Sequence, residues 1–96
     1  MPELDPIIHQ PVRLQIMAAL TALPDDAQLD FVALRKMLEL TDGNLSVHLR
    51  KLEDAGYVRM EKTFVGRKPR TFIAATPEGR AAFDEHVRAL KRIIGE

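Results

Sequence analysis

The residues best suited to bind a ligand cluster in one segment, residues 42–55. The candidate contacts are Asp42, Asn44, Ser46, Val47, Arg50 and Lys51. An asparagine amide offers the paired donor and acceptor that match adenine, an arginine can address guanine or a phosphate, and a valine can contact a thymine methyl. If this segment is a helix, these side chains are suited to the edges of DNA bases in a major groove.

A second cluster is purely cationic. Arg67, Lys68 and Arg70 fall within the five residues 66–70. The chain has 14 basic and 14 acidic residues and no net charge, but the charges are unevenly placed. Residues 1–30 hold five acids and one base, whereas residues 42–70 hold seven bases and four acids. A local basic surface on a neutral protein can bind a polyanion, with contacts to phosphates or in a narrow minor groove.

Other chemistries find little support in the 96 residues. The absence of cysteine excludes disulfides, thiolate metal sites and cysteine nucleophiles. The three histidines (His9, His48 and His86) are too far apart in sequence for a local metal site, and no nucleophile arrangement or phosphate-cradling glycine loop is present. We therefore expect no enzyme, no cofactor and no metal. With no membrane-spanning apolar run and an acidic N-terminus, we expect a cytoplasmic protein.

Helical periodicity predicts three helices that position the first cluster. They are expected at residues 11–23, 30–40 and 42–55, with Asp30 and Thr41 as N-caps of the second and third. In the third, Leu45, Leu49 and Leu52 are spaced as a buried stripe, which leaves the polar residues on the opposite face. His48 lies beside this stripe and is interpreted as a packing or hydrogen-bonding residue.

The remaining residues predict a hairpin and a long helix. Strand alternation over residues 57–75, interrupted by Gly66 and Pro69, indicates a β-hairpin with the cationic cluster at its tip. Thr76-Pro77 begins a helix over residues 77–94, about 27 Å long. Its apolar stripe consists of Phe83, Val87, Leu90 and Ile94. Because this helix is long for so small a core, we expect the stripe to form a dimer interface, with packing on its own domain as the alternative.

Four ordered blocks carry a family resemblance. Residues 38–58, LELTDGNLSVHLRKLEDAGYV, resemble the recognition-helix region of ArsR- and MarR-type transcriptional regulators. Residues 64–71 and 76–80 resemble the wing and the start of the final helix in a compact subgroup of winged-helix regulators, and residues 11–16 resemble its first helix. The similarity covers essentially residues 5–94.

The resemblance implies a mostly helical α+β fold, the winged helix-turn-helix, with a two-stranded β-hairpin wing and a long C-terminal dimerisation helix. We expect one domain over residues 1–96, with the helix-turn-helix at about 30–56, the wing at about 57–75 and the last helix at about 77–94. Asp84-x-His86 resembles the first half of a zinc site in some ArsR-type sensors, but the second half would fall beyond residue 96. The resemblance therefore gives no expectation of metal sensing.

The expected function is that of a homodimeric regulator that binds double-stranded DNA in a sequence-specific manner. Residues 42–55 would enter the major groove, and residues 64–71 would contact phosphates or the minor groove. The alternative is a winged-helix module for protein–protein contact or assembly, because a fold does not determine a function. RNA is a weaker candidate, since five aromatic residues supply no stacking platform. The sequence does not indicate whether an effector ligand exists or where it would bind.

Overall fold

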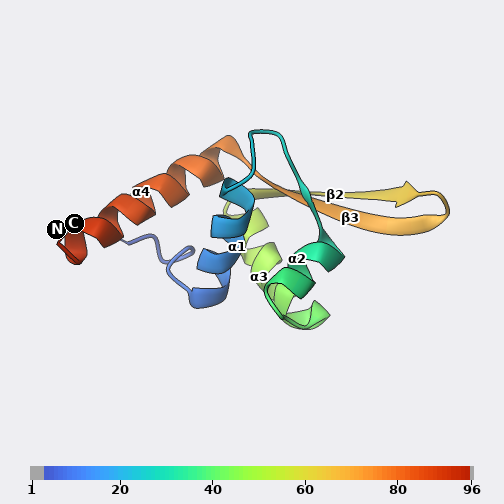
Figure 1. Cartoon of the computed structure of the whole chain (residues 1–96), viewed down its shortest axis with the longest axis horizontal. Coiled ribbons are helices and arrows are strands. Elements are labelled where there is room, and N and C mark those ends of the chain that lie inside the picture. The colour runs from blue at the N-terminus through green and yellow to red at the C-terminus, as the bar shows by residue number, and fades with distance from the viewer. Residues whose placement is uncertain (1–3, 96) are drawn as a thin grey trace.

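The computed structural model describes residues 4–95, so the acidic first three residues and Glu96 lie outside the described range. The elements follow in the order α1 (Pro11–Thr21), β1 (Leu29–Asp30), α2 (Phe31–Met37), α3 (Asp42–Asp54), β2 (Val58–Val65), β3 (Lys68–Ala75) and α4 (Pro77–Ile93). Figure 1 shows α1, α2 and α3 grouped in the middle of an elongated molecule, with the β2–β3 hairpin extending to one side and α4 to the other. The molecule measures 51 × 25 × 21 Å.

The predicted fold class is confirmed, and the sheet has one strand more than expected. Leu29 pairs with Ile73 and Asp30 with Phe72, so the antiparallel sheet has the order β1-β3-β2. Two residues are too few to show a strand period. The side chain of Asp30 also caps α2 by accepting a hydrogen bond from the backbone N–H of Ala33, so this residue ends a strand and begins a helix.

Most element boundaries agree with the predictions to within a few residues. The third helix is almost as predicted, and Thr41 caps it by accepting a hydrogen bond from the backbone N–H of Asn44 at 3.1 Å. The second helix ends at Met37, earlier than expected, because Glu39 adopts a left-handed backbone with φ of +54°. In the hairpin, β3 begins at Lys68, so Pro69 lies within the strand rather than in the connection. Only Gly66 and Arg67 connect β2 to β3.

The core lies where the three-helix group meets the inner half of the hairpin. Eleven residues form it: Ile8, Ile16, Met17, Leu20, Leu34, Leu45, Leu49, Leu52, Val58, Ile73 and Ala75. All three leucines of the predicted stripe on α3 are fully buried. Since these leucines occupy the inner side of α3, the polar side chains of this helix face solvent.

The core-facing side of α4 differs from its predicted stripe. Its buried residues are Gly79, His86 and Ala89. Of the stripe, Phe83 packs against the core of its own domain, as in the alternative interpretation. Val87 and Leu90 lie half-buried on the flank of the helix, and Ile94 is 67% exposed. The first turn of α4 lies directly on the residues before β2, because the Thr76 backbone N–H and hydroxyl donate to the carbonyl oxygens of Tyr57 and Gly56.

We predict that Gly79→Ala strongly destabilises the protein. A Cβ atom at this position would lie 2.0 Å from the carbonyl oxygen of Tyr57, so backbone would have to move. Overpacking of this kind costs about 3 kcal/mol of unfolding free energy, which urea denaturation measures.

Gly43→Ala is the matched control for this substitution. Gly43 also lies in the first turn of a helix, and its φ angle lies outside the left-handed region. A Cβ atom at this position would point into open space. A gain of roughly 0.4–1 kcal/mol is expected there because the unfolded chain loses conformational freedom. Equal stability of the two variants would show that α4 does not pack closely on Tyr57.

Candidate nucleic-acid interface

The outward face of α3 carries all six predicted contacts of the first cluster. Asp42, Asn44, Ser46, Val47, Arg50 and Lys51 are all exposed. Val47 is 59% exposed, unusual for an apolar side chain on an otherwise polar face. A ligand that presents hydrogen-bonding groups beside a methyl group would match this face, and base edges in a major groove do so.

Asp42 has a second contact within the helix-turn-helix. Its carboxylate forms an ion pair with the Nε atom of Arg35 at 2.8 Å. The pair joins the C-terminal half of α2 to the first residue of α3. Asp42 therefore positions the two helices relative to each other, whether or not it also meets a ligand.

His48 faces α1 rather than the exposed side of α3. Its Nδ1 atom lies 3.2 Å from a guanidinium nitrogen of Arg13, which also donates from Nε to the carbonyl of Ile7. Burial, followed by the charge of Arg13, lowers the pKa of His48 below the ordinary 6.5. The interpretation of His48 as a hydrogen-bonding residue agrees with this geometry.

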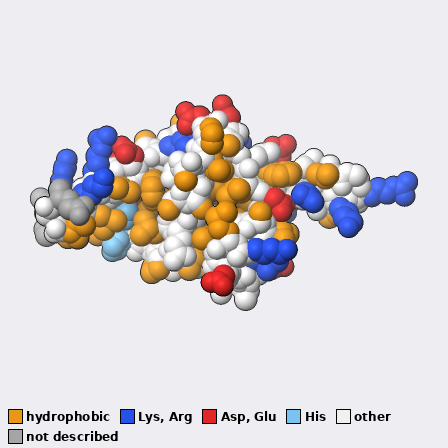
Figure 2. All heavy atoms as spheres, in the orientation of Figure 1, with side chains coloured by type: hydrophobic (Ala, Val, Ile, Leu, Met, Phe, Trp, Pro, Cys, Tyr) orange, Lys and Arg blue, Asp and Glu red, His pale blue; other side chains and the backbone are white. Residues whose placement is uncertain are grey.

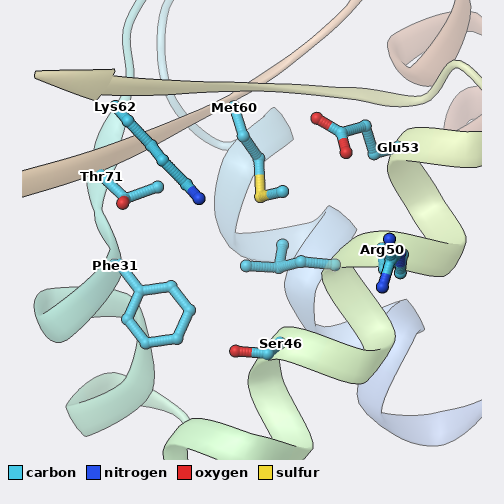
Figure 3. Close-up of a pocket in the computed structure, with 8 residues that line it drawn as sticks. Phe31, Ser46, Arg50, Glu53, Met60, Lys62 and Thr71 are labelled. Atoms are coloured by element: carbon cyan, nitrogen blue, oxygen red, sulfur yellow. The ribbon is translucent and has the colours of Figure 1, made fainter.

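An open cleft of about 480 Å³ separates α3 from the hairpin. It is lined by Phe31, Ser46, Leu49, Arg50, Glu53, Met60, Lys62 and Thr71. Figure 3 shows Lys62 and Met60 reaching from the hairpin into the space beside α3. Lys62 thus adds a second cation to the cleft that Arg50 lines, and it was not among the predicted contacts. Its position two residues after Met60, on the same side of a strand, is the signal that could have found it.

The two faces of the hairpin carry different side chains. Cross-strand partners share a face, so the pairs Met60–Ile73, Lys62–Thr71 and Phe64–Pro69 all lie on the cleft side. Of the predicted cationic cluster, Lys68 and Arg70 lie on the other face and Arg67 lies in the turn. Figure 2 shows Lys and Arg side chains along the projecting end of the hairpin. Arg67, Lys68 and Arg70 are all exposed.

The N-terminal segment is attached to α4 through His86. The Nδ1 atom of His86 accepts the backbone N–H of Asp5 at 3.2 Å, and the carboxylate of Asp5 accepts the hydroxyl hydrogen of Tyr57. This second bond is the main reason why the pKa of Tyr57 rises to about 12. His86 is 2% exposed, and its ring centroid lies 5.4 Å from that of His9.

The described residues show no arrangement for a metal ion and no membrane span. Between residues 4 and 95, no three His, Cys, Asp or Glu side chains are grouped as metal ligands. In the Asp84-x-His86 motif, His86 is buried against the N-terminal segment, whereas Asp84 pairs with Arg88. In the same range, no helix has the length and apolar character needed to cross a membrane.

Comparison with known proteins agrees with this geometry. The family model described as a winged helix DNA-binding domain matches residues 12–94, from α1 to the end of α4. The chain belongs to the winged helix DNA-binding domain family. This match covers the helix-turn-helix, the hairpin and the last helix together, so the β2–β3 hairpin is the wing of this family's fold.

Relatives of this winged-helix protein include transcriptional regulators. A transcriptional regulator homologue from Pyrococcus horikoshii OT3 superimposes with a TM-score of 0.84 at 36% identity, covering 93% of this chain and 85% of that one. A putative regulator of the MarR family from Enterococcus faecalis V583 gives 0.71 at 28% identity, covering 93% and 74%. An uncharacterized protein of Methanocaldococcus jannaschii is 38% identical over 84% of this chain and 85% of its own. The chain is thus a member of a winged-helix regulator family.

We predict that the winged-helix protein loses stability as the pH falls below about 6.5. Burial, followed by the proximity of His9, lowers the pKa of His86 below its ordinary value. The negative charge of Asp5 acts in the opposite direction and offsets only part of this decrease. Because Nδ1 accepts the N–H of Asp5, the neutral ring carries its hydrogen on Nε2, which has no hydrogen-bond partner among the described residues. A second proton would have to go on Nδ1, where it would face the N–H of Asp5. Histidines of the unfolded chain titrate near 6.5, so below that pH the unfolded state binds more protons and is favoured.

Urea denaturation at several pH values measures this dependence. The free energy of unfolding should stay level above pH ~7 and decrease between about pH 6.5 and 5. His86→Gln should flatten the decrease, and His48→Gln should do so through the separate contact with Arg13. A wild-type protein equally stable across this range would contradict the prediction.

Proposed function

We propose that the protein is a homodimeric transcriptional regulator that binds double-stranded DNA in a sequence-specific manner. The observation that carries the proposal is the outward face of α3, where Asn44, Ser46, Val47 and Arg50 are exposed together. This helix has 13 residues and is about 20 Å long. A helix of this size fits a major groove about 12 Å wide, where side chains near its N-terminal half meet base edges.

The cleft side of the wing supports the same placement. Arg50 on α3 and Lys62 on β2 both line the cleft, and the exposed Arg67 lies in the turn at the wing tip. Lys68 and Arg70 extend the positive charge along the opposite face of the wing. In the proposed complex, the cations of the cleft and of the turn would contact phosphates on either side of the groove that α3 enters. The wing therefore adds affinity and orientation, whereas α3 supplies the discrimination between bases.

The homodimer is supported by the flank of α4. This helix projects from the three-helix group, as Figure 1 shows. Val87 and Leu90 are half-buried, while Ile93 and Ile94 are 50% and 67% exposed. A hydrophobic stripe on a projecting helix gains burial by meeting a second copy across a two-fold axis. Such a dimer would present two α3 helices to half-sites about one turn of DNA (~34 Å) apart.

For the DNA contacts, we predict that Asn44→Ala and Arg50→Ala each weaken binding to a selected duplex by roughly 1–3 kcal/mol, with weaker discrimination between bases. The duplex comes from repeated selection out of a random library, and gel-shift titration gives the affinities. Both side chains are exposed, so thermal stability should not change.

Arg59→Ala is the matched control for Arg50→Ala. It removes the same charge from an exposed residue on the face of β2 that points away from the cleft, and it should leave discrimination unchanged. If Asn44→Ala and Arg50→Ala bind as the wild type does, α3 does not read the bases. A wild-type protein that binds no duplex favours a role in protein–protein assembly.

For the dimer, we predict that Val87→Glu combined with Leu90→Glu gives a folded monomer with much weaker DNA binding. Neither side chain belongs to the core or to the residues packed on it, so two carboxylates can be accommodated in solvent but not in an apolar interface. Light scattering measures the mass, and circular dichroism the fold. Ala81→Glu, at an exposed position of the same helix, is the control and should remain dimeric. A wild-type monomer at micromolar concentration would contradict the prediction.

A further inference from the structure

Phe64 is an aromatic residue that the core does not use. Its side chain is 71% exposed, more than any other large hydrophobic side chain in residues 4–95. It lies in β2 near the tip of the wing, opposite Pro69 of β3. Leaving a phenylalanine in water forgoes the free energy of burying it, so a partner that covers the ring would gain this energy.

The position of Phe64 places it on the side of the wing that faces DNA in the proposed complex. Alternation along β2 puts its side chain on the same face as Met60 and Lys62, which line the cleft beside α3. Phe64 lies four positions after Met60 in β2, so the ring lies about 13 Å farther out along the wing. The neighbouring minor groove is about half a helical turn (~17 Å) from a major groove that α3 occupies.

Positive charge surrounds this exposed ring. Arg67 lies in the turn, Lys68 and Arg70 lie on the opposite face, and Lys62 is two residues away on the same face. The nearest acid on β2 is Glu61, whose side chain lies on the other face. An apolar ring within a group of cations complements a polyanion that offers an apolar surface, and the stacked bases within a minor groove are such a surface.

We propose that Phe64, supported by Pro69, is a wedge that enters the minor groove and partly unstacks one base step, which bends the duplex. The inference rests on the proposed DNA-binding function. Insertion of apolar side chains between base steps is known to kink DNA by roughly 20–90°. Pyrimidine–purine steps unstack most easily, so the wedge would select such a step at a fixed distance from the bases that α3 contacts.

Energy transfer between dyes at the two ends of the selected duplex measures the bend. The wild-type dimer should shorten the distance between the dyes, and Phe64→Ala should lose most of this change and bind about tenfold more weakly. Phe64→Leu keeps an apolar wedge and should retain most of the bend. A 2-aminopurine placed at successive steps under the wing should brighten at one step with the wild type and should not do so with Phe64→Ala.

Two controls separate a wedge from other roles of the wing. Val65→Ala removes an exposed apolar side chain from the opposite face and should change neither bend nor affinity. Phe64→Ala removes no charge, so the slope of log affinity against log salt should stay as in the wild type, whereas Arg67→Ala should reduce it by ~0.9 if one phosphate contact is lost.

The outcomes distinguish this inference from the proposed function. If the wild type and Phe64→Ala bind the duplex with the same bend and affinity, the wedge is overturned and the proposed DNA-binding function stands. A change in oligomeric mass with Phe64→Ala, at unchanged bend, also overturns it, because the ring would then cover a second copy of the chain. A wild-type protein that binds no duplex overturns both.

Discussion

The candidate DNA-binding face of α3 depends on the burial of Leu45, Leu49 and Leu52. All three are fully buried, and their spacing places them on one side of α3. A rotation of the helix by one residue would move Ser46 toward the core, where an unbonded hydroxyl costs free energy, and would bring a leucine into water. The apolar side of α3 thus determines which side chains the helix presents outward.

Close approach of backbone to backbone orients α4. Gly79 lies against the carbonyl of Tyr57, and Thr76 donates to the two residues before β2. The N-terminal segment then closes over the other side of this junction, since Asp5 bonds both Tyr57 and His86. Together these contacts fix the position of α4 relative to the hairpin and the N-terminal segment.

The wing consists of an inner half that belongs to the core and an outer half that does not. Val58, Ile73 and Ala75 are buried, whereas all residues from Phe64 to Arg70 are exposed. The outer half is held only by the pairing of β2 with β3 and by a two-residue turn. Its side chains therefore contribute little to the core.

The helices, the hairpin and the outward face of α3 could be predicted from the sequence, because periodicity, capping by Thr41 and Thr76, and turn residues act between near neighbours. Which of these faces meet depends on long-range packing. Strand β1 exists because β3 lies beside Leu29, and Lys62 lines a cleft because α3 lies opposite. His86 is buried because Asp5, 81 residues away in sequence, packs against it. Such contacts arise from packing between distant segments, and no local pattern encodes them.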